Sequence, residues 1–399
     1  MKIVRIVYDW PPPWQGLAPH PYELTVSQAK LGHQIFIFCG RWPKAGPIEN
    51  PESTIIYPTI REPFQGTISF TSSVILFFKY LLWRRKNKDV DIIHSHGHFA
   101  IWIYLYRLFL QKFMPWSDEL KTPLVVHFHN TVKGRWEALK KEGQFIMPHS
   151  RFMAWPIWLF SDKISIKVAA ACIFVGEDTK NEAVKYYKTD PKRCFVVETG
   201  VNVERFHRIG EEERAKTRGE LGLDMYDKVI LNHGIMTERK NIHLLVEMME
   251  FLPDIYKLFL VGPFDPIYLQ KVEQIIKNKN LEKRIIKVGY TPYPQTPIAF
   301  QAANIFVLPS SFEGVPKVVM QALSTEVPCL VSGFKLNEEI KGLYYLENTK
   351  PKTIARQILE IAKNPVSVDV VKVAQKYSWD KKAKEVEKIY DFAKKNYLL

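Results

Sequence analysis

The strongest constraint on the fold is an alternation, carried along most of the 399 residues, of short β-rich runs with longer stretches of helical periodicity. This alternation is typical of parallel sheets whose faces are covered by the intervening helices, and it predicts the α/β class. We expect strands at residues 2–8, 34–39, 53–57, 91–94, 124–127, 170–175 and 194–198 in the first half. In the second half we expect them at 228–233, 256–261, 285–288, 305–308 and 327–331.

The length of the chain exceeds the size at which one hydrophobic core keeps growing, so we expect two domains. The stretch 200–221 is rich in charges and lacks a buried-strand pattern, which places the junction near it. The predicted domains are residues 1–200 and 201–378, with a helix at 379–399 that crosses back to the first domain. Because α/β sheets bind ligands at the carboxyl ends of their strands, we expect the ligand cleft between the two domains.

Four cysteines, at positions 39, 172, 194 and 329, lack the spacing of a zinc site or a disulfide framework and favour a reducing compartment. The apolar run at 3–8 is too short for a signal peptide and is expected to be the first strand. These features predict a cytoplasmic protein.

A formal net charge of +14 calls for an anionic partner or for solvated lysines, and residues 1–198 hold 26 Lys and Arg against 17 Asp and Glu. No recognised nucleic-acid-binding module accompanies the charge, so we expect no nucleic-acid partner. An apolar block at 70–88 contains Trp83 and ends in a basic cluster, and a second apolar segment at 99–112 is interrupted by Arg107. Both are shorter than the about 20 apolar residues that a membrane crossing needs. We expect peripheral docking on anionic phospholipid at the inner face of the cell membrane, and we favour a core helix for the second segment.

Six of the 11 histidines fall at expected strand ends or nearby loops of the first domain. They are His20, His94, His96, His98, His127 and His129. A zinc site is one interpretation. However, no Asp or Glu lies among these residues and they come from separate loops, so we favour polar side chains lining a cleft. His94 and His127 are also open to a role as core residues.

The segment 308–328 joins a strand end, a turn and a helix start. We expect Pro316 to be the first helical residue, where its missing N–H costs nothing. The free N–H groups of the helix start attract an anion such as a diphosphate, and Glu313 stands where a carboxylate can hold sugar hydroxyls. The alternative is an ordinary helix with an acidic N-terminus.

A second strand end, after residue 233, is followed by Gly234 and by a predicted helix start that contains Arg239 and Lys240. The helix dipole disfavours basic residues at that end, so a solvated helix start explains them less well than a diphosphate ligand does. Gly16, in the loop after the first strand, allows a similarly close approach of the backbone to a phosphate.

Three further patterns occur in order along the chain: DIIHSHGH at 91–98, VVHFHNT at 125–131 and ETGVNVERF at 198–206. Together with Gly234, Lys240 and Glu313 they resemble the motifs of the retaining glycosyltransferases of the GT-B architecture, family GT4. The resemblance covers essentially the whole chain and implies two Rossmann-like domains facing across a cleft. The motifs include that family's Gly-Arg-x-x-x-x-Lys diphosphate motif and the start of its Glu-x7-Glu motif.

The resemblance implies a hexosyltransferase-like enzyme that moves a sugar, with retention, from a nucleotide diphosphate sugar to a hydroxyl acceptor. We expect the acceptor to be a lipid-linked sugar or glycolipid precursor in envelope polysaccharide or glycoconjugate synthesis. No cofactor and no metal are expected. The implied catalytic residues are His129, Glu313 and Lys240, and the implied acceptor-side residues are His20, His96 and His98. The implied donor-binding residues are Gly16, Gly234, Arg239, Lys240, Glu313, Gly314, Val315, Pro316, Lys317, Val318 and Gln321.

The chain departs from the family pattern at four positions. Ile235 replaces the Arg of the diphosphate motif, Gln321 replaces the second Glu, Gln15 replaces a loop glycine and Glu326 replaces a glycine before the last expected strand. A neutral hydrogen bond is worth about 0.5–1.5 kcal/mol against about 1.5–3 kcal/mol for a charged one, so weaker donor binding is expected. A soluble acceptor is the alternative for an active transferase, and the departures leave open a noncatalytic glycosyltransferase-like binding subunit.

Overall fold

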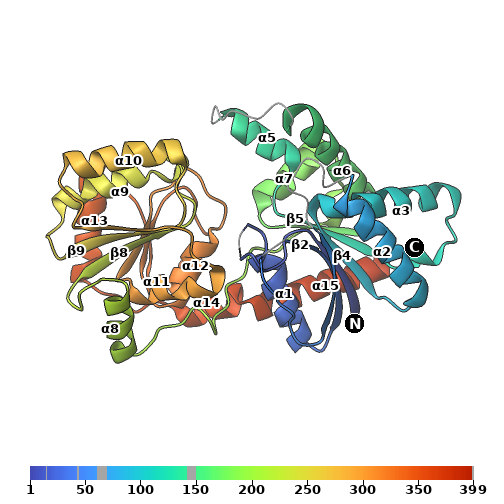
Figure 1. Ribbon diagram of the computed structural model, residues 1–399, viewed down its shortest axis with the longest axis horizontal. Helices are drawn as coiled ribbons and strands as arrows, with labels where there is room; N and C mark the ends of the chain where they lie inside the picture. The colour runs from blue at the N-terminus through green and yellow to red at the C-terminus, as the bar shows by residue number, and fades with distance from the viewer. Residues whose placement is uncertain (15, 43–44, 61–69, 142–149, 398–399) are drawn as a thin grey trace. The chain divides into compact units, whose positions relative to one another are not determined.

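The computed structural model describes residues 1–14, 16–42, 45–60, 70–141 and 150–397, so Gln15 lies outside the described residues. The chain divides into two compact units, Met1–Thr199 with Trp379–Leu399 and Gly200–Ser378. Each unit is a parallel sheet covered by helices (Figure 1), which confirms the α/β class.

The first unit contains a seven-stranded sheet in the order β3-β2-β1-β4-β5-β6-β7, in which every pair of neighbours is parallel. Its strands are β1 (Lys2–Val7), β2 (Gln34–Arg41), β3 (Thr54–Ile60), β4 (Ile92–His96), β5 (Leu124–Phe128), β6 (Ala171–Phe174) and β7 (Cys194–Val196). Its helices are α1 (Pro19–Lys30), α2 (Ser72–Lys86), α3 (Ile101–Phe113), α4 (Asp118–Lys121), α5 (Val132–Lys141), α6 (Trp155–Val168), α7 (Glu177–Tyr187) and α15 (Trp379–Tyr397).

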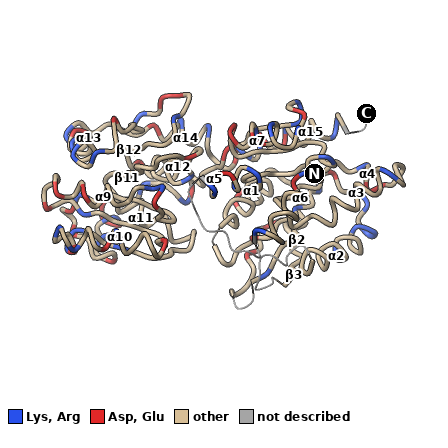
Figure 2. The backbone as a smooth tube through the Cα atoms, turned by 90° about the horizontal axis from the view of Figure 1, so that it is seen from above, with Lys and Arg blue, Asp and Glu red and all other residues tan. Residues whose placement is uncertain are grey.

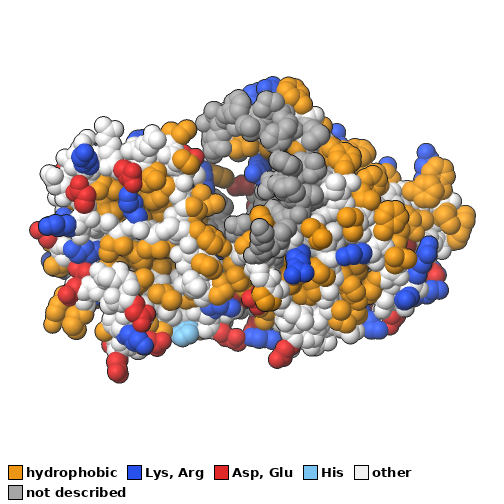
Figure 3. Space-filling view, viewed as in Figure 1, with side chains coloured by type: hydrophobic (Ala, Val, Ile, Leu, Met, Phe, Trp, Pro, Cys, Tyr) orange, Lys and Arg blue, Asp and Glu red, His pale blue; other side chains and the backbone are white. Residues whose placement is uncertain are grey.

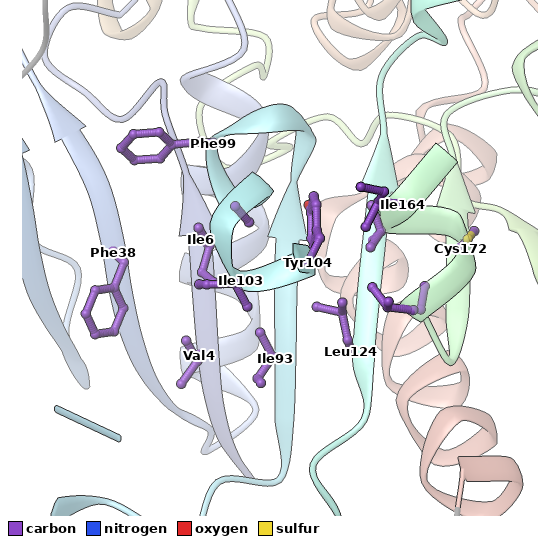
Figure 4. Packing of buried hydrophobic residues seen from close by; sticks show 14 of the residues in the cluster. Val4, Ile6, Phe38, Ile93, Phe99, Ile103, Tyr104, Leu124, Ile164 and Cys172 are labelled. Atoms are coloured by element: carbon purple, nitrogen blue, oxygen red, sulfur yellow. The ribbon is translucent and has the colours of Figure 1, made fainter. Parts of the chain in front are cut away.

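Both faces of this sheet are apolar because successive side chains of a strand point to opposite faces. On β1, Val4 and Ile6 belong to the core beneath α2, α3 and α6, whereas Ile3 and Val7 belong to the core beneath α1 and α15. Figure 4 shows Val4, Ile6, Ile93 and Leu124 side by side in the first of these cores. Because both faces of the sheet are buried, the strands are nearly continuous apolar runs in the sequence.

The second unit contains a six-stranded parallel sheet in the order β10-β9-β8-β11-β12-β13. Its strands are β8 (Lys228–His233), β9 (Tyr256–Val261), β10 (Ile285–Val288), β11 (Ile305–Leu308), β12 (Cys329–Val331) and β13 (Leu343–Tyr345). Its helices are α8 (Glu211–Glu220), α9 (Ile242–Met248), α10 (Pro266–Asn278), α11 (Pro297–Ala302), α12 (Lys317–Ser324), α13 (Pro351–Lys363) and α14 (Val370–Tyr377). The sequence did not predict β13, whose three residues are only partly buried and show no alternating pattern.

The C-terminal helix α15 packs in the first unit against α1. Tyr390 anchors it there, because its hydroxyl lies 2.6 Å from Nδ1 of His94 and accepts a hydrogen bond from Gln28. Residues at the two ends of the sequence therefore share one hydrophobic core.

The two aromatic and basic segments of the first unit form helices with one buried face. On α2, Trp83 is 9% exposed and packs on Phe36, so the interpretation of this tryptophan as a membrane anchor is wrong. On α3, the guanidinium of Arg107 is fully buried and donates hydrogen bonds to Glu119, which explains a charge inside an apolar segment. No helix in the described ranges combines the length and the apolar character that a membrane crossing requires.

Candidate functional site

Two loops of the second unit are joined at the carboxyl ends of the neighbouring strands β8 and β11. The backbone N–H of Ser311 donates to the carbonyl of Arg239 at 2.9 Å, and the side-chain amide of Asn241 donates to the carbonyl of Pro309, also at 2.9 Å. The fold therefore brings the Arg239–Lys240 pair and the loop of Glu313 into one site.

The carboxylate of Glu313 is held in place at this site. Its Oε1 accepts a hydrogen bond from the hydroxyl of Ser310 at 2.8 Å and lies 2.9 Å from the guanidinium of Arg239. The backbone N–H of Glu313 donates to the carbonyl of Gly333 at 2.8 Å. The guanidinium of Arg239 also donates to the carbonyl of Phe312, so this arginine is committed to the Glu313 loop.

Lys240 supplies a further positive charge at the site. No ion pair links it to another residue among those described, and burial lowers the pKa of its ammonium group while the Glu313 carboxylate raises it. Gly234 makes room for this side chain. A Cβ on Gly234 would lie 2.6 Å from Nζ of Lys240, and the backbone φ of +128° strains any other residue.

The helix α12 follows Glu313 and begins at Lys317, not at Pro316. Pro316 lies just before it in an extended conformation, with φ −72° and ψ 121°, so the expected first helical residue is wrong by one position. Gly314 and Val315 lie in the turn, and the helix continues through Ser324. The helix therefore begins four residues after Glu313 in the chain.

Two of the four departures from the family pattern, Ile235 and Gln321, differ strongly in exposure. Ile235 is 64% exposed, whereas Gln321 is 3% exposed on α12.

His233, which the sequence analysis did not include among the candidate site residues, ends β8 beside two lysines. Burial, Lys240 and Lys317 together lower the pKa of His233 to about 3. A histidine kept neutral between two cations marks this strand end as a site of positive potential.

Five of the predicted histidines of the first unit form one cluster. The rings of His127 and His129 are parallel with centroids 4.9 Å apart, and the ring of His20 meets His129 edge-on at 4.5 Å. His94 and His96 stack at 4.6 Å on the same strand end. The histidines of β4 and β5 come together from separate loops because these two strands are neighbours in the sheet.

The cluster has two sets of three nitrogens close enough for a metal, His20 with His127 and His129, and His94 with His96 and His127, each set within 4.8 Å. The buried guanidinium of Arg5, whose Nη1 lies 3.2 Å from Nε2 of His96, opposes a further cation here. His94 and His127 are fully buried and belong to the core.

The buried histidines predict that the protein loses stability in acid. Burial holds the pKa values of His94, His96 and His127 well below 6.5, so the unfolded chain takes up protons first as the pH falls through about 6.5. The free energy of unfolding is then expected to fall by about 1.4 kcal/mol per pH unit for each such histidine. Urea unfolding at a series of pH values between 7.5 and 5 measures this fall in the free energy of unfolding.

The matched variants are His127→Leu, which removes one of the buried rings, and His207→Leu, which removes an exposed ring in the second unit. His127→Leu should reduce the pH dependence of the free energy of unfolding, and His207→Leu should leave that dependence unchanged. Equal slopes in all three proteins would contradict the explanation.

Beside the cluster lies a pocket of about 180 Å³ at the carboxyl ends of β1, β4 and β5. Of the predicted site residues, His96, His98 and His129 line it. His20 does not line this pocket but packs against His129. Gly16, expected near the donor, is exposed with a φ of +59° in the first unit.

Both units match family models of glycosyltransferases. Residues 14–205 match Glycosyltransferase Family 4, and residues 213–385 match Glycosyl transferases group 1. An uncharacterized glycosyltransferase of Methanocaldococcus jannaschii is 22% identical over 98% of both chains. The alpha-monoglucosyldiacylglycerol synthase of Streptococcus pneumoniae is 23% identical over 84% of this chain and 71% of its own. The UDP-Gal:alpha-D-GlcNAc-diphosphoundecaprenol alpha-1,3-galactosyltransferase of Escherichia coli is 26% identical over 66% and 62%.

Solved structures share the fold at low sequence identity. Sucrose-phosphate synthase from Thermosynechococcus elongatus superposes with a TM-score of 0.72 at 17% identity, over 98% of both chains. Anabaena HepE in complex with UDP and glucose superposes with a TM-score of 0.68 at 13% identity, over 97% of this chain and 98% of that one. These matches confirm the expected GT-B fold.

Proposed function

Because the chain belongs to the GT4-type glycosyltransferases of the GT-B fold, we propose that it moves a sugar from a nucleotide diphosphate sugar to the hydroxyl of a lipid-linked sugar or glycolipid precursor. The transfer retains the anomeric configuration. The bond between the anomeric carbon and the diphosphate breaks, the acceptor oxygen bonds to the same face, and the leaving phosphate takes the acceptor proton.

The observation that carries this proposal is the joined pair of loops that presents Lys240, Glu313 and the start of α12. The ammonium of Lys240 and the free N–H groups of the helix start stabilise the diphosphate as it leaves. Glu313, fixed by Ser310 and Arg239, accepts hydrogen bonds from the donor sugar hydroxyls. Ile235 supplies no cation, so Lys240 is the residue of the diphosphate motif that meets the charge of the diphosphate.

We propose that the reaction needs no metal and no cofactor. The charge that develops on the leaving diphosphate is met by Lys240 and by the dipole of α12, which act as a divalent cation does in other phosphate chemistry. In the first unit, Arg5 beside His96 disfavours a cation in the histidine cluster. Full activity after dialysis against EDTA is the expected result.

A lipid-linked acceptor is supported by two observations. The relatives include proteins whose names contain monoglucosyldiacylglycerol and diphosphoundecaprenol. In the first unit, large apolar side chains are exposed on α2 and α3, and Figure 3 shows such side chains interspersed with Lys and Arg over that part of the surface. Figure 2 shows basic residues at the end of α2 and around α4. Such a mixed surface suits the headgroup layer of an anionic membrane.

The membrane contact predicts a loss of vesicle binding when apolar residues of α2 become acidic. Phe78 and Leu82 are 58% and 61% exposed, so Phe78→Glu with Leu82→Glu should leave the core intact and remove the contact. We expect at least a tenfold drop in co-sedimentation with phosphatidylglycerol vesicles at low salt. Ile267→Glu, at an 80% exposed position of the second unit, is the control. If the wild-type protein itself does not sediment, the proposed membrane contact is refuted.

Incubation with a panel of UDP-, GDP- and ADP-sugars tests the function as a whole. A true donor should raise the melting temperature by mass action and should be hydrolysed slowly or transferred. The anomeric configuration of the product, read by NMR, tests retention. A protein that binds a donor and neither transfers nor hydrolyses it would instead be a noncatalytic subunit, in keeping with Ile235 and Gln321.

A further inference from the structure

The pocket of the first unit contains a carboxylate that the donor chemistry does not use. Asp162, on α6, is 1% exposed. Its Oδ2 accepts hydrogen bonds from the backbone N–H of Val132 at 2.9 Å and from the hydroxyl of Tyr187 at 2.7 Å. Its Oδ1 lies 3.5 Å from Nδ1 of His98. Burying a carboxylate is costly, and donors from α5 and α7 hold this one with an oxygen directed at a histidine.

His98 is held from its own side as well. It follows β4 in the turn Gly97–Ala100, and the hydroxyl of Tyr104 donates to the carbonyl of Gly97 at 2.8 Å. Burial lowers the pKa of His98 below 6.5, so the ring is neutral at pH 7. With Nδ1 facing Asp162, the proton of the neutral ring belongs on Nδ1, which leaves the lone pair of Nε2 available to accept a hydrogen bond.

The wall around this pair is aromatic. The rings of His98 and Trp158 are nearly parallel, at 9° with centroids 5.8 Å apart, and Trp155 adjoins Trp158 at 6.2 Å. Arg135 lines the same pocket and forms no ion pair within the described part of the chain. An apolar wall with a few convergent polar groups is the usual form of a small-molecule site. At about 180 Å³ it is smaller than the usual 300–1,000 Å³ of such sites and suits a single ring.

We propose that this pocket binds a sugar ring of the acceptor on Trp158, and that His98, positioned by Asp162, accepts a hydrogen bond from an acceptor hydroxyl. A pyranose offers what this pocket needs, because it has an apolar C–H face to lie on an aromatic ring and hydroxyls around its edge. A bare lipid hydroxyl on a flexible chain offers no such face. The acceptor is therefore a glycosylated molecule, a statement that rests on the proposed transferase function and narrows it.

Binding of simple glycosides to the full chain, without a donor, tests the pocket directly. Saturation-transfer NMR is run with the methyl pyranosides of glucose, galactose and mannose, and with 1,2-octanediol as a sugar-free hydroxyl compound. We expect at least one glycoside to bind and the diol to give no signal. Binding of the diol alone, or of neither class, overturns the proposal.

Variants locate the binding. Trp158→Leu should lower the affinity for the glycoside at least tenfold. Trp158→Phe, which keeps an aromatic face, should retain most of that affinity. Trp116→Leu, at a 72% exposed tryptophan away from the pocket, is the control. Circular dichroism checks that each variant is folded. Unchanged affinity in Trp158→Leu would place the sugar elsewhere.

The role of Asp162 is tested by a readout that a merely structural residue would not move. The groups that face His98 are Asp162 on α6, which raises its pKa, and Arg135 on α5, which lowers it. Protonation of His98 removes the acceptor lone pair, so glycoside affinity should fall in acid. Asp162→Asn should shift that acid midpoint to lower pH, because the carboxylate that favours the charged ring is gone.

Tyr187→Phe is the matched control, since it removes one hydrogen bond from Oδ2 of Asp162 and leaves the charge opposite His98. It should keep the wild-type midpoint. If glycoside affinity is lost at the same pH midpoint in Asp162→Asn and in the wild-type protein, the role of Asp162 is only to stabilise the packing of the helices around it. Failure here is distinct from failure of the proposed function. Hydrolysis of a UDP-sugar without glycoside binding refutes the pocket alone, and glycoside binding without donor hydrolysis refutes the transferase alone.

Discussion

Glu313→Ala is expected to abolish measurable sugar transfer, a loss of about 10³-fold or more in kcat, because the variant lacks the carboxylate that Ser310 and Arg239 hold in place at the candidate site. The donor diphosphate still meets Lys240 and the start of α12, so the nucleotide should continue to bind. The measurement is the initial rate of transfer or donor hydrolysis, together with the thermal shift produced by the free nucleotide diphosphate.

The effect of Glu313→Ala on stability should be small. The ion pair of Glu313 with Arg239 is partly exposed, and exposed pairs are worth about 0–1 kcal/mol. Glu326→Ala is the matched control because it also removes a carboxylate from an arginine partner, Arg208, within the same unit. It should retain activity. Transfer by Glu313→Ala at a rate near that of the wild-type enzyme would refute the assignment.

Lys240→Met is expected to lower kcat by about 10²- to 10³-fold and to weaken donor binding. Arg239 cannot replace the missing charge, since its guanidinium is tied to Glu313 and to the carbonyl of Phe312. Lys240→Arg should rescue only in part, because the space around Nζ is set by its close approach to Gly234. Lys271→Met, which breaks an exposed pair with Glu238, is the control.

The pH profile provides an independent check on Lys240. Only the protonated ammonium stabilises the leaving diphosphate, and burial lowers its pKa from 10.5. The kcat/KM of the wild-type enzyme should therefore decline as the pH rises through that lowered pKa, at a pH below 10.5. If kcat/KM stays constant at alkaline pH and Lys240→Met keeps full activity, groups other than Lys240 stabilise the charge of the leaving diphosphate.

Much of the candidate site could be predicted because its residues mark strand ends. Gly234, Lys240 and Glu313 follow apolar runs that are unmistakable strands, and the bounds of β8 and β11 are those expected. Asp162 could not be predicted. It lies inside an apolar helix, and the one available signal is a carboxylate in the otherwise hydrophobic stretch of α6. Trp83 was misinterpreted because an aromatic residue beside basic ones looks the same in sequence whether it faces lipid or the core.

The sequence by itself determined the class of the fold and the family, because hydrophobic periodicity and strand-end motifs are local and survive at low identity. Only the tertiary structure decided which of those residues meet. Arg239 reaches Glu313 because β8 and β11 are neighbours in the sheet, and the histidines of β4 and β5 form one cluster for the same reason. Strand order depends on packing across the whole unit, and no local pattern of residues encodes it.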